Sequence, residues 1–140
     1  MEADGFVFGT PVFFAHPSGA VLSFLDRVFY SSSDKDWARK PFEFKPAAAI
    51  TSARCAGTTA SFDVMNKYFT ISNMPVVSSN YWNMVHGFTP DDVRQDKEGM
   101  QVMRNIGHNM AWMLKCIEAG KQNGITPPKV EVGEITNFIR

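Results

Sequence analysis

Three short apolar runs lie along the chain, and each lacks the polar alternation of a strand with one exposed face. The runs are Gly5–Gly9, Pro46–Thr51 and Val76–Ser78. Continuous apolar character is typical of strands that are buried on both faces of a parallel sheet. We therefore predict a parallel sheet whose first strand follows directly after Met1–Asp4.

Apolar residues at helical spacing predict two helices between these strands. The first covers Gly19–Tyr30 with Ser18 as its N-cap, and the second has Thr58 or Thr59 as its N-cap and ends before Pro75. The apolar stripe of the first helix is Val21, Leu22, Leu25, Val28 and Phe29. The stripe of the second includes Phe62, Met65, Phe69 and Ile71.

A longer helix is predicted after the last strand. Thr89–Asp92 combines a capping threonine, a proline for the first turn and acidic residues that suit a helix N-terminus. This helix is expected to run to Ala119, with Gly120 as the glycine that follows its end. Its stripe is rich in methionine, a pattern that usually reflects adaptable core packing. The stripe consists of Met100, Met103, Ile106, Met110, Met113, Leu114 and Ile117.

The alternation of strands and helices predicts an α/β fold with right-handed crossovers. In such folds, ligands bind outside the carboxyl ends of the parallel strands. The loops that leave those ends are Thr10–Pro17, Ser52–Gly57 and Ser79–Thr89. We therefore expect the functional residues in these three loops.

The length of 140 residues fits one domain. We place that domain at residues 1–124 and expect 125–140 to be a tail without a core of its own. The polar stretch Ser31–Lys45 is expected to be a surface loop, held down by Trp37 and Phe42.

Charge and cysteine content exclude several classes of function. Lysine plus arginine and aspartate plus glutamate both number 14, and a nucleic-acid or anionic-membrane partner favours an excess of cations. Two cysteines are too few for a disulfide framework or an all-cysteine iron–sulfur cluster. Cys55 is expected to act as a small apolar residue and Cys116 to lie in the core. No apolar run or leader pattern indicates a membrane span or a signal peptide, so we expect a cytoplasmic protein.

Several motifs follow one another in a fixed order up to about Gly124. They are Gly9-Thr10-Pro11-Val12-Phe13-Phe14-Ala15-His16-Pro17-Ser18-Gly19, Asp26-Arg27, Ser52-Ala53-Arg54, Gly57-Thr58-Thr59, Asn73-Met74-Pro75-Val76-Val77 and Tyr81-Trp82-Asn83-Met84-Val85-His86-Gly87. This series resembles the flavodoxin-like NAD(P)H-dependent FMN reductase family, in its multimeric-flavodoxin and iron–sulfur-flavoprotein branch, without the cluster cysteines. The resemblance implies a three-layer αβα domain.

The resemblance also implies a site for FMN. Its ring system needs a flat apolar bed, which Phe13 and Phe14 suit, and fixed backbone groups, which Pro11 and Pro17 favour by stiffening their loop. Gly57 permits close approach of the backbone. The cofactor-binding residues implied are Thr10, Pro11, Val12, Phe13, Phe14, Ser52, Ala53, Arg54, Cys55, Gly57, Thr58, Trp82 and Asn83.

Other interpretations of these residues stay open. Phe14 also suits a core or a subunit interface, Arg54 a solvated surface cation, and Trp82 the core of its own chain. His16 and His86 are expected to be loop residues rather than metal ligands, because no third ligand has a recognisable spacing.

The activity implied is that of an FMN-dependent oxidoreductase, with NAD(P)H as cosubstrate and a small-molecule electron acceptor. Because the flavin itself supplies the bond chemistry, no catalytic residue of the protein is expected. The resemblance further implies a homo-oligomer, either a dimer or a tetramer. The alternatives are an electron-transfer flavoprotein without nicotinamide activity and a non-catalytic remnant that serves as an interaction subunit.

One departure from the family concerns the start of the chain. Aligned by its motifs, Gly5–Gly9 is expected to correspond to the third of the family's five strands, and we expect this chain to lack the first two strands, the first two helices and the loop that wraps the FMN phosphate. The missing first strand is central in the order 2-1-3-4-5. Gly5–Gly9 is then expected to be an open edge, and either the chain is part of a longer protein or its sheet is completed by association.

Overall fold

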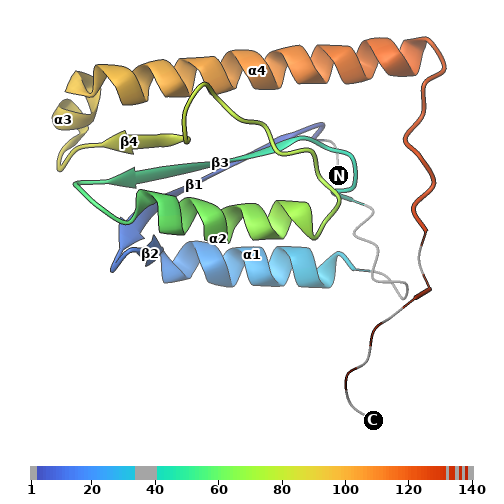
Figure 1. Cartoon of the computed structure of the whole chain (residues 1–140), viewed down its shortest axis with the longest axis horizontal. Helices are drawn as coiled ribbons and strands as arrows, with labels where there is room; N and C mark the ends of the chain where they lie inside the picture. The colour runs from blue at the N-terminus through green and yellow to red at the C-terminus, as the bar shows by residue number, and fades with distance from the viewer. Residues whose placement is uncertain (1–2, 34–40, 132, 135, 137, 139–140) are drawn as a thin grey trace.

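The computed structural model describes residues 3–33, 41–131, 133, 134, 136 and 138. Four strands form one sheet in the order β2-β1-β3-β4. Helices α1 and α2 lie on one face of this sheet and α4 lies on the other, which gives three layers (Figure 1). The elements are β1 Phe6–Phe13, β2 His16–Pro17, α1 Gly19–Ser31, β3 Ala47–Ala53, α2 Thr58–Thr70, β4 Met84–His86, α3 Pro90–Gln95 and α4 Lys97–Gln122.

The first strand is longer than its apolar run. β1 continues through Phe13 and pairs antiparallel with β2, so Thr10–Pro17 is a hairpin rather than the expected loop. Its turn residues Phe14 and Ala15 have φ values of 51° and 59°. Positive φ at both positions is the geometry of a two-residue hairpin turn, for which glycine and asparagine are the usual residues. Neither residue is present here, so the sequence carries no turn signal.

The second strand confirms the parallel sheet. β3 pairs parallel with β1, and Thr10 lies opposite Thr51 in the register. The side chains of Ala47, Ala48 and Ala49 are fully buried, and their small size lets helices pack closely on both faces.

The third strand is displaced from its expected position. Val76 forms only an isolated bridge with Ala47, and the regular strand β4 lies at Met84–His86, where a loop was expected. Side chains hold the intervening segment against α4, because Ser79 Oγ donates to the Val102 carbonyl at 2.9 Å. Asn109 Nδ2 likewise donates to the Ser78 carbonyl at 2.8 Å. Because of these contacts, the segment between the Val76 bridge and β4 lies against α4 and does not pair with β3.

The long C-terminal helix is in fact two helices. Thr89 caps α3 as expected and forms a reciprocal capping box with Asp92, but α3 ends at Gln95. Asp96 then caps α4, which runs beyond the expected end at Ala119 to Gln122. Gly120 therefore lies inside the helix, and Gly124, with a φ of 78°, follows its end.

The core lies on both faces of the sheet. Between the sheet and α1 and α2, a buried aromatic cluster includes Phe29, Phe42 and Phe69, so Phe42 anchors its loop as expected. Trp37 lies outside the described residues. Between the sheet and α4, Val77, Ile106 and Met110 are buried. The expectation of core packing is therefore confirmed for the central part of the methionine-rich stripe, at Ile106 and Met110.

Three residues expected in the core are exposed. Ile71 follows the end of α2 and is 68% exposed, and Ile117 is 43% exposed. Cys116 is exposed as well. The last turns of α4 extend past the edge of the sheet (Figure 1), so the apolar stripe there has no sheet to cover it. Within the described residues, no helix is long and apolar enough to cross a membrane.

Candidate functional site

The parallel register brings the three predicted loops to one end of the sheet (Figure 1). Pro11 lies opposite Ser52, and Ser52 lies opposite Val85. The Gly87 N–H donates to the Ala53 carbonyl at 3.0 Å, just beyond the last pairing of β3 with β4. The carboxyl ends of β1, β3 and β4 therefore form one continuous edge, as predicted.

Close packing joins the hairpin to the turn that follows β3. Gly57 has a φ of 95° and precedes α2 directly, so it occupies the N-cap position that the sequence assigned to Thr58 or Thr59. A Cβ atom at this position would lie 2.6 Å from the Cα of Ala15 and 2.9 Å from Cγ1 of Val12. Real Cβ atoms do not approach other atoms so closely, and only glycine fits here.

The threonines of the site are buried and bind other parts of the protein. Thr10 Oγ1 accepts the Ser18 N–H at 3.0 Å and donates to the Pro11 carbonyl at 2.9 Å, which fixes the hairpin against the start of α1. Thr58 Oγ1 lies 3.1 Å from the Met84 sulfur, and this contact joins α2 to β4. Thr10 and Thr58 therefore position the backbone around the site.

Several predicted residues point into solvent. Phe13 is 58% exposed at the end of β1, and Arg54 and Cys55 are exposed on the turn after β3. Arg54 has no ion pair or hydrogen bond within the ranges that the structure describes. The edge thus combines an apolar surface with an unpaired cation.

Tyr81 and Trp82 form an aromatic pair just before β4. Their ring centroids are 5.1 Å apart with the planes inclined by 60°, and Trp82 is 53% exposed, which excludes the alternative that it lies in the core. Asn83 is 1% exposed, and its side-chain amide donates to the Val77 carbonyl at 3.5 Å. Among the described residues, its buried Oδ1 atom has no hydrogen-bond partner. Asn83 therefore lies beneath the surface of the site, and Trp82 lies on it.

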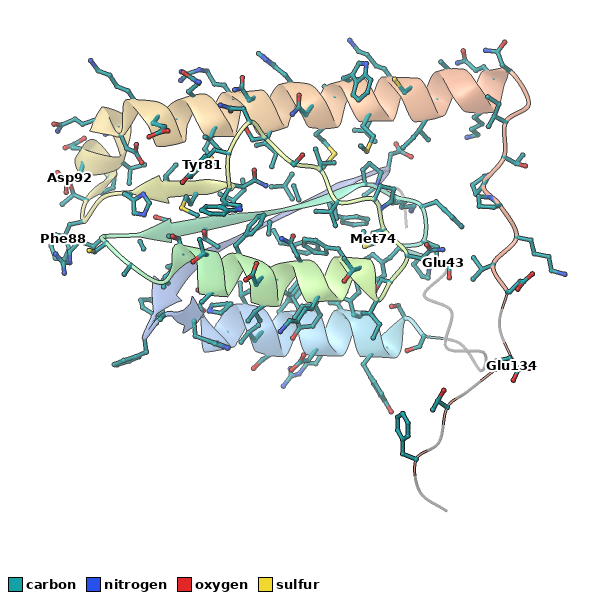
Figure 2. All side chains as sticks on the ribbon, in the orientation of Figure 1. Glu43, Met74, Tyr81, Phe88, Asp92 and Glu134 are labelled. Carbon is teal, nitrogen blue, oxygen red and sulfur yellow. The ribbon has the colours of Figure 1, made fainter. Side chains whose placement is uncertain are left out.

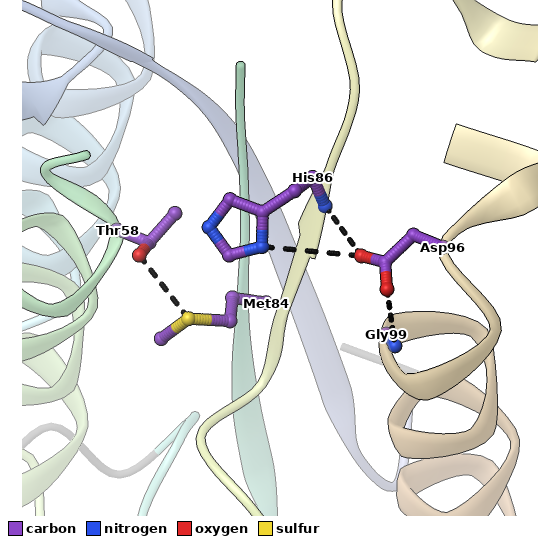
Figure 3. Close-up of polar contacts among 5 residues, drawn as sticks. All are labelled: Thr58, Met84, His86, Asp96 and Gly99. Carbon is purple, nitrogen blue, oxygen red and sulfur yellow. Dashed lines mark hydrogen bonds and ion pairs between the residues drawn. The ribbon is translucent and has the colours of Figure 1, made fainter. Parts of the chain in front are cut away.

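Asp96 ties the end of β4 to the start of α4 (Figure 3). One carboxylate oxygen accepts the backbone N–H of His86 at 2.7 Å, and the other accepts the backbone N–H of Gly99 at 2.9 Å. The carboxylate also lies 3.9 Å from Nδ1 of His86. His86 is thus the last residue of β4 and not a loop residue. Sequence reasoning missed Asp96, although an aspartate before a helix is a common N-cap.

Residues 1–89 match the family of NADPH-dependent FMN reductases. The chain belongs to this family. An iron–sulfur flavoprotein of Methanocaldococcus jannaschii is 28% identical over 122 residues, which make up 84% of this chain and 62% of that protein. The chain therefore spans less than two thirds of the length of this relative.

Solved structures show the fold of this FMN reductase family member. A flavodoxin, WrbA-like protein from Agrobacterium tumefaciens matches with a TM-score of 0.53 and 19% identity, over 77% of this chain and 69% of that one. The flavodiiron core of a Synechocystis protein matches with a TM-score of 0.55 and 15% identity, over 83% of this chain and 24% of that one. The fold is therefore flavodoxin-like, as the motifs implied.

One cavity of the described residues lies at the carboxyl edge of this family member, and it is small. This cavity lies beside His86, measures about 60 Å³ and is lined by Tyr81, Met84, His86, Asp96, Glu98, Gly99 and Val102. A larger groove, of about 580 Å³, is lined by residues of the last turns of α4. Those turns lie at the other end of the sheet (Figure 1). Ligand pockets usually have volumes of about 300–1,000 Å³. The cavity beside His86 is therefore too small by itself to hold a ligand of ordinary size.

Proposed function

We propose that the chain is the ring-binding part of an FMN-dependent NAD(P)H:acceptor oxidoreductase. The observation that carries the proposal is the contact between Gly57 and Ala15, which joins two of the motifs that carry the family resemblance into one surface. That surface carries the exposed side chains of Phe13 and Arg54. Membership of the FMN reductase family supports the same conclusion.

The ring end of FMN fits the residues at this edge. Phe13 offers an apolar face, and the backbone of Pro11 and Val12 is held in place by pairing with β3 and β2. The turn after β3 presents the N-terminus of α2, whose backbone N–H groups favour an electron-rich carbonyl or a negative charge. Arg54 adds a cation to the same edge. Because position 57 is glycine, the hairpin at Ala15 packs directly on this turn, and the two backbones lie together at the edge.

The chemistry that FMN would supply, when bound, is the acceptance of a hydride from the nicotinamide and the transfer of its electrons to the acceptor. The protein then acts by position and electrostatics. The paired backbone of β1 and β3 orients the ring, and the Phe13 side chain excludes water from one part of it. Arg54 and the start of α2 would stabilise negative charge on a ring bound at this edge. No side chain has to donate or accept a proton in this scheme.

The phosphate end of FMN requires further chain. On the side away from β3, β1 pairs with β2 only at Val12 and Phe13. No described strand lies beside Phe6–Pro11 on that same side. The relative from Methanocaldococcus jannaschii is longer than the part matched here. We propose that a segment beyond residues 3–138, in the same polypeptide or in an associated one, supplies the phosphate loop.

A visible spectrum of the purified protein, before and after anaerobic addition of NADPH, tests the proposal. The expected result is flavin absorbance that NADPH bleaches, with FMN affinity falling in a Phe13→Ala variant. Tyr30→Ala is a matched control, because Tyr30 is an exposed aromatic far from this edge on the last turn of α1. Flavin absorbance that NADPH does not change would instead indicate an electron carrier. A colourless protein that binds no added FMN would refute the assignment of the ring site to this chain.

A further inference from the structure

A row of basic side chains runs along the outer side of α4. This basic row consists of Lys97, Arg104, His108 and Lys115, all of them exposed. The four residues follow one another at intervals of 7, 4 and 7 residues. At about 3.6 residues per turn, these intervals bring all four positions to one line along the helix. The buried residues Val102, Ile106 and Met110 lie on the opposite side of α4, against the sheet.

The outer side of α4 is open to solvent. This helix forms one outer layer of the fold, and its side chains project outward with no described segment covering them (Figure 2). At a rise of about 1.5 Å per residue, the distance from Lys97 to Lys115 along the helix is ~27 Å. The basic row is therefore a straight and accessible surface that is longer than most contacts between single side chains require.

The basic row is not neutralised within the described part of the chain. A solvated helix face commonly pairs opposite charges that lie three or four residues apart. Among the described residues, none of the four basic side chains has an ion-pair partner. Glu118 follows Lys115 by three residues, but its carboxylate accepts a hydrogen bond from Gln122 at 2.9 Å. The row thus has one sign along its length, although the chain has a formal net charge of zero.

An exposed aromatic ring lies beside the middle of the basic row. Trp112 follows His108 by four residues and precedes Lys115 by three, so it shares this side of α4. It is 65% exposed. Tryptophan and arginine are enriched among the residues that contribute most to protein interfaces. The surface therefore combines a line of basic groups with one apolar anchor.

We propose that an acidic amphipathic helix of a partner protein docks along the basic row, with carboxylates facing the row and an apolar side chain facing Trp112. The proposal goes beyond the proposed function and does not depend on bound FMN. The intervals favour a helix as the partner, because the carboxylates of a second helix recur at the same 7, 4 and 7 residues. One face of a strand instead repeats evenly at about 6.6–6.8 Å. Complementary charge steers and orients such a partner.

Other anionic partners fit this surface less well. An anionic membrane favours clustered basic residues beside a broad apolar face, and nucleic acid favours an excess of cations over a whole domain. The basic row is one residue wide, and Gln101 and Glu118 lie next to it on the helix. A narrow row on a chain without net charge is complementary to a partner that is itself narrow and carries carboxylates at discrete positions.

A synthetic helical peptide tests the proposal. The probe is an alanine-rich peptide of about 25 residues, long enough to be helical alone, with four glutamates at the intervals of the basic row and one leucine placed to meet Trp112. A second peptide has the same composition, with its glutamates distributed around the helix. Fluorescence anisotropy of the labelled peptides measures binding to the full chain. The first peptide should bind at low ionic strength and weaken with added salt, and the second should bind at least about tenfold more weakly.

Variants of exposed residues identify the surface. Arg104→Glu should weaken binding of the first peptide by at least about tenfold, and Trp112→Ala by about fivefold. A peptide with lysine in place of the glutamate that faces Arg104 should restore binding to the Arg104→Glu variant. Lys67→Glu, the same reversal of charge on the exposed side of α2, is the matched control and should change nothing.

The outcomes distinguish docking in a fixed register from general attraction between unlike charges. Equal binding of the two peptides would overturn the proposal, as would equal losses in Arg104→Glu and Lys67→Glu. Absence of binding at low ionic strength would also overturn it. Vesicles that contain phosphatidylserine and a DNA duplex are the remaining probes. Tighter binding to either, without competition from the first peptide, would assign the basic row to a membrane or to nucleic acid. These results do not depend on FMN, so they are independent of the test of the proposed function.

Discussion

Gly57 and Ala15 approach so closely that a Cβ atom on the glycine would lie 2.6 Å from the Cα of the alanine. The two residues belong to different turns, one after β3 and the other between β1 and β2. Their contact sets how the hairpin lies on the start of α2, and therefore the shape of the proposed flavin bed. Both positions also have positive φ, which strains the turn at Ala15 but costs little at Gly57, because glycine has no Cβ.

Replacement of Gly57 by alanine should destabilise the protein. The new methyl group clashes with Ala15 and the backbone keeps an unfavourable φ, so we expect a loss of roughly 2–4 kcal/mol in the free energy of unfolding. Urea denaturation measures this loss. Gly107→Ala is the matched control, because a Cβ there meets nothing within 4 Å in the middle of α4. That change should stabilise the protein by about 0.5–1 kcal/mol. Equal effects of the two substitutions would contradict the packing argument.

Removal of the Asp96 carboxylate should loosen the end of β4. Asp96→Ala leaves the backbone N–H groups of His86 and Gly99 without their acceptor, so we expect a loss of about 1–3 kcal/mol. Asp96→Asn keeps one carbonyl oxygen and should lose less.

A surface aspartate provides the control for this prediction. Asp91 lies in the first turn of α3 and pairs with Arg94 in solvent. Asp91→Ala should change the free energy of unfolding by no more than about 0.5 kcal/mol. A comparable loss in the two alanine variants would show that Asp96 acts only as an ordinary surface charge.

Tyr68 should titrate at unusually high pH. Burial and the hydrogen bond that its hydroxyl donates to Asp26 raise the pKa of Tyr68 from 10.0 to about 12. The protonated form is favoured in the folded state, so this contribution to stability is complete below pH 10.0 and is lost as the pH rises towards about 12.

Absorbance of the phenolate over a pH series measures this titration. Asp26→Asn should lower the pKa of Tyr68 towards its ordinary value, because the variant removes both the carboxylate charge and its strong acceptor. Tyr68→Phe should remove the high-pH phase and identify it, since the chain has two other tyrosines, Tyr30 and Tyr81. A phase that persists in Tyr68→Phe would assign the raised pKa to one of those two residues.

Much of the site was predictable from local signals. The apolar runs located β1 and β3, and Thr89–Asp92 marked the start of α3, because burial and capping act through residues close in sequence. Ligands bind at the carboxyl ends of parallel strands, and this rule predicted that Pro11 and Ser52 lie at one edge of the sheet. The register of β1 and β3 places them opposite each other there. The expected family and fold followed from motif order and are confirmed.

The features that escaped prediction depend on contacts between distant segments. The Phe14–Ala15 turn has no glycine or asparagine, and its geometry is enforced by packing on Gly57. β4 lies at Met84–His86 because α4 draws the preceding segment off the sheet. Cys116 looked like a core residue by its helical position, but the helix outruns the sheet that would bury it.

The sequence by itself therefore determined the alternation of strands and helices and the edge that we propose for the flavin bed, because these follow from composition and local pattern. Only the tertiary structure decided which of the implied residues lie on that edge. It exposed Phe13, Arg54 and Trp82 and buried Thr10 and Asn83, because burial depends on which segments pack together. For the same reason it alone showed that Phe14 stands in solvent.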